Sequence, residues 1–397
     1  MNMKEVDNMN INQSYTLINL INKQMWGEDA LTITDLRGVI SMGQSVLSSA
    51  DSKDNFMNVL TDRIGSTSIR NLDLQLDFPN LLRNSFEWGS VIQKINIQPF
   101  EAQSQEAWNI GDNNFTPTNF KIDKPVVTQT FFKDANTWEF DVTIPDTMLK
   151  TAFTSAEAFG AFIDGIMGAL TDSMTMALNS MSYAAIDNFI AEKVKNENGV
   201  INVLTGYNTQ AGTSYTSLEE AMDDKEFYRY VGMVTRNVMK YMSKPSKIYN
   251  IGNLVRATQR DNMHVLISSD FWSGYTTYLS SDTFHDELVG LDGFAEYVTL
   301  QASSDGDGAI PTIGDNTKIS VIPASNAASD TTAVTVQGVI AILADREAIG
   351  VGYDDRFTAT DRNNRNRYTN YTSGATIQYF NDLSENGVII IAAPEGE

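Results

Sequence analysis

The chain has 397 residues, 42% of them hydrophobic and 20% charged, which is enough for two or three compact units with a sizeable core. Its 50 Asp and Glu residues outnumber its 28 Lys and Arg residues, and a net charge of −22 argues against a domain that reads DNA or RNA. The lack of cysteine excludes disulfides, zinc–thiolate sites and cysteine nucleophiles, and two histidines leave few candidates for metal or triad chemistry.

The first 60 residues are polar and rich in Asn, Ser and Met, and their apolar spacing predicts short helices over 14–25 and 34–48. They hold no core of their own, so we interpret them as an arm that packs on other parts of the molecule or on its neighbours. A helical face over 57–64 and an alternating strand over 72–76 follow. The charged residues within 1–10 do not match a secretory leader, and we expect no removed propeptide.

Residues 86–144 contain three β-type runs, over 91–97, 126–132 and 138–144. Between the first two runs lies the polar, turn-rich stretch 100–124. This pattern predicts a long hairpin with an extended loop. A long loop within a compact domain is commonly functional or a contact element.

A long helix is the clearest predicted element. Thr154 and Glu157 match a capping box, and apolar residues then recur at three- and four-residue steps from Phe159 to Val194. Asn198-Gly199 is a plausible end. At about 1.5 Å per residue, the helix would span roughly 55–60 Å.

Residues 200–345 alternate between helical and strand patterns, which predicts a compact mixed unit. The predicted helices cover 227–242 and 270–279, and the predicted strands cover 247–251, 264–267, 297–300, 318–322 and 336–343. Residues 348–393 return to β patterning and end in the apolar run 388–393. No window reaches the ~18 apolar residues of a membrane helix, so we expect no membrane association.

The sequence carries no motif that predicts an enzyme. It contains no P-loop, no dinucleotide-binding glycine motif, no HExxH and no nucleophile elbow. The loop that begins at Asp305 hints at calcium, but Ala309 and Asn316 stand where an EF-hand needs oxygen ligands. His264 and His285 lack metal-like spacing. We therefore predict no catalytic residue, cofactor or metal.

Paired acids at 223–224 and 354–355 are typical of solvated turns. A concentrated positive feature follows the second pair, with interleaved asparagines; its arginines are Arg356, Arg362, Arg365 and Arg367. These guanidinium groups could bind phosphate or grip carboxylates of neighbouring subunits. The abundance of acids in the same chain favours self-association, and a solvated hairpin tip stays open as the alternative.

This order of elements resembles the Hong Kong-97-type capsid fold of tailed phages, an α+β fold with an N-arm, an E-loop, a P-domain with a long spine helix, and an A-domain. The amino-acid sequence is similar to those of the major capsid proteins of small podophages of the phi-29 kind. Four stretches carry that resemblance: 56–65 with Ile69-Arg70, 146–155, 262–270 with 290–294, and 367–371 with 388–393.

The resemblance implies a division of the chain into seven segments. These are 1–60, the N-terminal arm; 61–85, the first part of the P-domain; 86–144, the E-loop hairpin; 145–199, the P-domain with the spine helix; 200–345, the A-domain; 346–380, the returning strands of the P-domain; and 381–397, a C-terminal strand and tail.

The resemblance also implies a function. The chain would assemble with itself, as hexamers and pentamers, into an icosahedral or prolate shell that encloses double-stranded DNA without sequence-specific binding. It would assemble in the bacterial host cytoplasm and reside in the virion. A scaffolding protein, a portal and head fibre or decoration proteins are further candidate partners. Trp108, Phe115 and Phe120 in the extended loop would be subunit contacts, together with the four arginines.

Two other functions stay open at this point. One is an encapsulin-type nanocompartment shell, which shares the fold. The other is a hydrolase that uses an Asp/Glu acid–base pair, which nothing supports beyond the presence of acids. The long helix and the non-repetitive mixed body argue against a tail or fibre protein.

Overall fold

The computed structural model describes residues 11–27, 30, 32–49, 51–53, 55–56, 59, 77–83, 92–100, 124–125, 127–132, 135–280, 294–297, 300–301, 312–313, 318–326 and 329–394. Apart from residue 59, the predicted elements over 57–64 and 72–76 lie outside these residues, as does most of the loop that begins at Asp305. No helix in the described ranges is long and apolar enough to cross a membrane.

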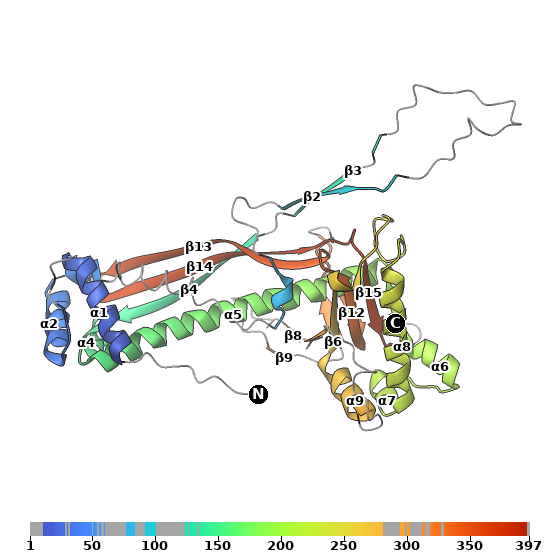
Figure 1. The fold of residues 1–397 in the computed structure, drawn as a ribbon, viewed down its shortest axis with the longest axis horizontal. Helices are drawn as coiled ribbons and strands as arrows, with labels where there is room; N and C mark the ends of the chain where they lie inside the picture. Colours follow the sequence, from blue (N-terminus) through green and yellow to red (C-terminus); the bar gives the residue numbers. More distant parts are fainter. Residues whose placement is uncertain are drawn as a thin grey trace, which may run out of the picture.

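The long helix α5 (Ala156–Lys195) lies along three long strands and gives the molecule its elongated shape (Figure 1). The strands are β4 (Ala135–Pro145), β13 (Ile349–Asn363) and β14 (Tyr368–Asn381), in the order β1-β13-β14-β4, where β1 (Leu82–Arg83) pairs in parallel with β13. The helix predicted from apolar spacing is confirmed. Its N-cap is Ser155, one residue beyond the predicted Thr154, because the Ser155 hydroxyl accepts the Ala158 N–H at 3.0 Å.

One end of α5 is covered by α1 (Ile11–Trp26), α2 (Leu36–Leu47) and α4 (Asp146–Ala152). Their apolar faces form one core with the start of α5, in which Phe56 packs on Phe153 and Phe159 with ring centroids 5.2 and 6.4 Å apart. Both predicted N-terminal helices therefore exist. In the single chain α1 packs on the chain's own long helix, and α2 joins the same core.

The other end is a compact unit built on a five-stranded sheet of order β5-β15-β12-β6-β7. Alternate residues of β12 and β15 belong to two cores: Ile342 and Ile389 pack in the core that contains α5, and Ile340 and Ile390 pack in the core that contains α8. The elements of this unit are β5 (Val200–Asn202), α6 (Val203–Ala211), α7 (Leu218–Met222), α8 (Lys225–Met242), β6 (Met263–Ser268), α9 (Ser269–Ser280), β7 (Phe294–Tyr297), β12 (Val339–Asp345) and β15 (Gly387–Ile391).

Two strand predictions need correction. Residues 247–251 form bends and turns. Residues 336–343 divide between β11 (Val334–Gln337) and β12, which belong to different sheets, because Gly338 takes a positive φ of 62°. The predicted strand 297–300 covers the end of β7 and the start of β8 (Leu300–Gln301). The remaining short elements are η1 (Pro79–Leu81), η3 (Arg260–Asn262), β9 (Thr312–Ile313) and β10 (Lys318–Val321).

Candidate functional site

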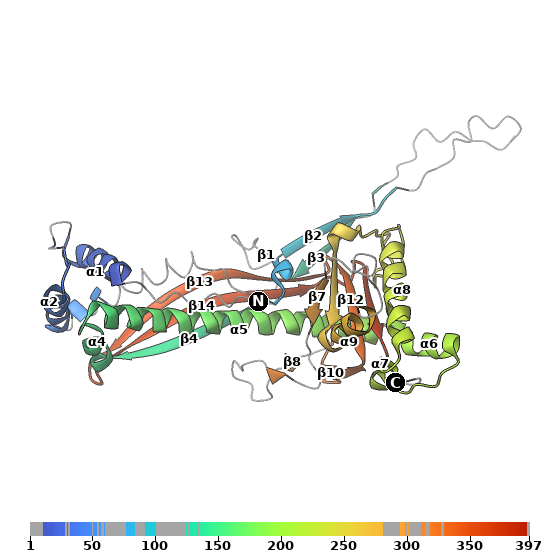
Figure 2. The ribbon, with the colours of Figure 1, turned by 60° about the horizontal axis from the view of Figure 1, so that its bottom comes forward.

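The strands β2 (Ile92–Ile97) and β3 (Val127–Phe132) form an antiparallel hairpin that projects from the body (Figures 1 and 2). Ile97 pairs with Val127 and Gln93 with Phe131, so alternate residues of both strands share one face. That face carries Gln93 and Gln129 beside four apolar side chains that are open to solvent: Ile95, Ile97, Val127 and Phe131 are 55%, 59%, 46% and 56% exposed. We call these four residues the hairpin face.

The opposite side of the hairpin is anchored to the body by charge. Lys94 lies 2.8 Å from Asp382 and 2.9 Å from Glu385, and the Arg256 side chain lies 3.2 Å from Glu385. The Val255 N–H donates to the Gln98 side chain at 3.1 Å. The base of the hairpin is thus tied to two loops of the compact unit, which fixes the direction in which the hairpin projects.

The anchor's electrostatics follow from its burial. Burial acts to lower the pKa of Lys94, but its bonds to Asp382 and Glu385 outweigh that effect and raise the pKa above its usual value. Burial raises the pKa of Glu385, and the nearby Lys94 and Arg256 offset only part of this rise. The Lys94 ammonium therefore stays charged, whereas Glu385 takes up a proton at a higher pH than an ordinary glutamate.

The turn between β13 and β14 is a second candidate, because it carries the predicted arginines. Arg362 faces inward, where it lies 3.3 Å from Asp146, and Asp146 lies 2.9 Å from Lys53. Burial acts to raise the pKa of Asp146, but its hydrogen bonds to Lys53 and Arg362 hold the pKa below its usual value. The Arg367 carbonyl accepts the Asp146 N–H at 3.0 Å, with Arg367 at φ 57°. This turn is therefore fastened to the start of α4.

The structure separates the predicted contact residues. Arg365 and Arg367 are exposed at the turn, and Arg362 is engaged within the chain. Arg356 lies in β13 opposite Ala375, and its side chain is outside what the structure describes. The predicted aromatic anchors lie outside the described residues; they are Trp108, Phe115 and Phe120.

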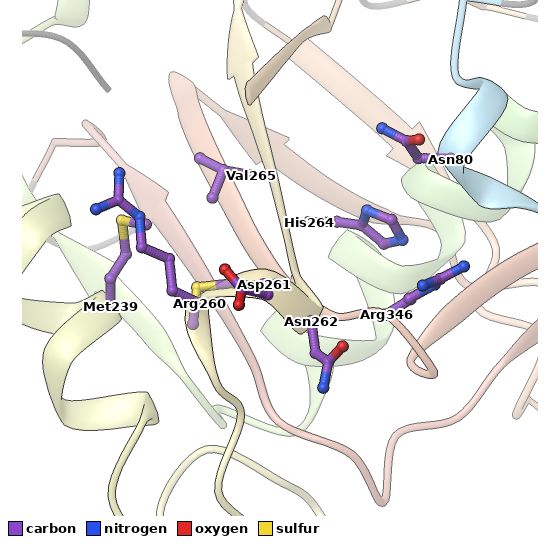
Figure 3. A pocket seen from close by; sticks show the side chains of 9 residues that line it. Asn80, Met239, Arg260, Asp261, Asn262, His264, Val265 and Arg346 are labelled. Carbon is purple, nitrogen blue, oxygen red and sulfur yellow. The ribbon is translucent and has the colours of Figure 1, made fainter. Parts of the chain in front are cut away.

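A hollow of about 560 Å³ opens at the start of β6 (Figure 3). Asn80, His264 and Arg346 lie on one side of it, and Arg260 lies on the other. Asp261 is the one carboxylate among the described residues that line it, whereas the hydrolase alternative requires a pair of acids. His285 falls outside the described chain. No group of three potential metal ligands was found among the residues with described positions.

One surface was missed by the sequence analysis. Arg236, Lys240, Lys244 and Lys247 are all exposed along α8 and just beyond its end. Arg236 and Lys240 are four residues apart and so share one side of the helix, and Lys244 and Lys247 follow in the exposed segment after it. We call these four residues the α8 stripe. A count of charge along the chain would have found it, because such spacing indicates a solvated, charged helix face.

Comparison with known proteins finds likenesses along nearly the whole chain. A family model, the Phi29-like phage major capsid protein, matches residues 18–391. The major capsid protein of Bacillus phage GA-1 is 25% identical over 190 residues, which cover 47% of this chain and 39% of that protein. The major capsid protein of Streptococcus phage Cp-1 is 23% identical over 241 residues, which cover 60% of this chain and 62% of that protein. The aligned part spans less than two thirds of either relative.

Solved structures bear on the fold alone. A chain from the structure of the head fiber and inner core protein gp22 of native bacteriophage P68 has a TM-score of 0.51 and 11% identity, and it covers 80% of this chain and 85% of that chain. This likeness confirms the Hong Kong-97-type α+β arrangement that the sequence predicts.

Proposed function

Because the chain belongs to the Phi29-like phage major capsid protein family, we propose that it assembles with itself into the icosahedral or prolate shell that encloses the double-stranded DNA of a tailed phage. The shell is built from hexamers and pentamers of this chain and resides in the virion. Membership of a phage capsid family favours this function over a nanocompartment shell. As a member of a structural capsid family, the chain acts in this proposal by assembly and not by catalysis.

The observation that carries the proposal is the hairpin face. A two-stranded hairpin is marginally stable by itself, and a contiguous exposed apolar patch on a soluble protein marks an interaction site. The hairpin's other side is fixed to the body through Lys94, so the four apolar side chains are held in place before any partner arrives. A surface that is ordered in advance loses less conformational entropy on binding. The hairpin face is thus suited to pack on an adjacent copy of the chain.

Further contacts and partners belong to the same proposal. Arg365 and Arg367 at the β13–β14 turn meet carboxylates of adjacent copies, and Trp108, Phe115 and Phe120 add apolar anchors beyond the hairpin. A scaffolding protein, a portal and head fibre or decoration proteins are the candidate partners of the shell. The negative charge of the chain keeps the packed DNA from adhering to the shell wall.

The test is a double substitution on the hairpin face, Ile97→Asp with Phe131→Asp. We expect the variant to fold, because both side chains are exposed, and its assembled fraction in velocity sedimentation to fall by about tenfold or more, since charge replaces buried apolar contact. Ile322→Asp, at another exposed apolar position, is the control and should assemble as the wild type does. Equal assembly of all three proteins would contradict the role given to the hairpin.

A further inference from the structure

Basic residues are concentrated in one segment of this acidic chain. Residues 225–260 hold eight Lys and Arg and a single acid, Glu226, which gives a net charge of +7. The other 361 residues hold 20 basic and 49 acidic side chains, which gives −29. A charge separation of this size within one molecule creates a basic surface that attracts the acidic surface of a second copy.

Arg256 pairs with Glu385 in the hairpin anchor, whereas other cations of the segment face outward. The inner side of α8 is buried through residues that include Phe227, Val231 and Val238. The α8 stripe lies outside this core, and at about 1.5 Å per residue its two helical members, Arg236 and Lys240, are roughly 6 Å apart along the axis. Lys244 and Lys247 continue the stripe beyond the end of α8.

Apolar side chains interleave with these cations. Met233, Tyr241 and Ile248 are 49%, 59% and 71% exposed. The phosphate backbone of a duplex offers charge to the stripe but no apolar surface to these three residues. A protein surface offers both, with apolar burial for affinity and charge complementarity for register and specificity. The mixture therefore favours a protein partner over DNA.

A complementary surface lies on the same compact end of the molecule. The helix α7 precedes α8 and exposes Glu219, followed by the exposed Asp223. Glu220 is held within the chain, because its carboxylate accepts the Thr216 N–H at 2.7 Å. Figures 1 and 2 both place α7 and α8 at the end of the molecule away from α1 and α2. We call Glu219 and Asp223 the α7 acids.

We propose that the α8 stripe of one copy binds the α7 acids of the adjacent copy, so that each copy contributes both halves of a repeated head-to-tail contact. Two different surfaces on one subunit generate a closed ring when the rotation between copies closes. The contact rests on the proposed shell function and names a surface on which the rings are held together. It also offsets self-repulsion, which a net charge of −22 per copy imposes on assembly.

The test compares three charge variants with the wild type by velocity sedimentation, with a candidate scaffolding protein co-expressed. The stripe variant is Lys240→Glu with Lys244→Glu. The control is Arg37→Glu with Lys150→Glu, which has the same net charge and also alters exposed cations. The swap variant adds Glu219→Lys and Asp223→Lys to the stripe variant. Thermal melts by circular dichroism establish that each variant is folded.

We expect the stripe variant to lose about tenfold or more of its assembled fraction relative to the control, and the swap variant to regain most of it, since the swap restores opposite charges across the contact. If the wild type assembles and the stripe variant assembles as well as the control, the result would overturn this inference alone. Equal loss in both variants would assign the effect to net charge and would also overturn it. A wild type that never assembles would overturn the proposed function, and the contact with it.

Double-stranded DNA is the other possible ligand of the α8 stripe, and a binding measurement tests it. Each protein is mixed with a double-stranded DNA fragment at about 0.1 M salt, where electrostatic attraction is only partly screened. We expect weak binding that the stripe variant does not change. Tight wild-type binding that the stripe variant abolishes would overturn the assignment to a second copy and assign the α8 stripe to nucleic acid.

Discussion

At the residue scale, the charged groups that this chain buries differ in how they are compensated. Asp146 and Lys94 have partners of opposite charge within 3.3 Å. Lys193, on α5, is fully buried, and its ammonium donates to two uncharged acceptors, the Tyr249 carbonyl at 2.8 Å and the Asn198 side chain at 3.1 Å. Burial lowers the pKa of Lys193 to about 7.

This lowered pKa makes a prediction for the pH dependence of stability. Above pH 7 the folded chain releases the Lys193 proton while the unfolded chain retains it, so the free energy of unfolding rises with pH until the unfolded lysine also titrates. We expect the wild type to gain about 2 kcal/mol over Lys193→Met between roughly pH 6.5 and pH 8.5. Urea denaturation of both proteins at the two pH values measures this gain. A stability difference that does not vary with pH would show that Lys193 keeps its proton in the fold.

At the scale of elements, the hairpin is a projecting element whose two sides have opposite character. In its anchor, Lys94 of β2 pairs with Asp382 and Glu385, and Arg256 also pairs with Glu385. The anchor thus joins three segments that are far apart in the sequence. Asp382 and Glu385 are both nearly buried, so they depend on the two cations for compensation. Loss of one cation leaves a buried charge only partly compensated, which costs more than the ion pair contributes.

We therefore predict that Lys94→Met releases the hairpin without unfolding the body. The amides of β2 and β3 should exchange with solvent about tenfold faster or more, while those of β12 and β15 at the centre of the compact sheet should change little, because local opening draws on local contacts. Hydrogen exchange with mass spectrometry measures both sets in one experiment. Lys150→Met, at an exposed lysine, serves as the control. Unchanged protection of β2 and β3 in Lys94→Met would mean that the anchor does not hold the hairpin.

Elements with strong local periodicity could be predicted from the sequence. The apolar spacing from Phe159 to Val194 revealed α5, and the alternation over 138–144 revealed β4. The predicted strand over 247–251 was wrong. These residues belong to a turn in which the Asn250 side chain donates to the Leu254 carbonyl and accepts the Leu254 N–H. At Gly338 the chain passes from one sheet to another, because β11 pairs with β10 and β12 pairs with β15. No local sequence pattern shows these partners.

The candidate site could be predicted only in part for the same reason. The hairpin and the arginine-rich turn follow from local patterns, whereas the anchor and the partner of Arg362 depend on contacts between distant segments. The inward direction of Arg362 comes from its pairing with Asp146, 216 residues away. The α8 stripe could have been found from spacing alone, since its cations recur at three- and four-residue steps.

At the scale of the whole molecule, the chain combines a packed body with surfaces that a single copy leaves open. The helix α5 and the β4-β14-β13 layer form the body, and a continuous core links them to the compact sheet. The hairpin face, the exposed arginines of the β13–β14 turn and the α8 stripe are distributed over this body at separate places. Surfaces that differ from one another suit head-to-tail contacts, which close into rings.

The most direct measurement of the central claim is negative-stain electron microscopy of the purified chain, expressed alone and together with the genes that neighbour it, after gel filtration has separated assemblies from monomer. We predict closed shells, tubes or capsomer rings in at least one of these preparations. A strict monomer under every condition, including with a candidate scaffolding protein present, would contradict the assignment of this chain as a shell-forming protein.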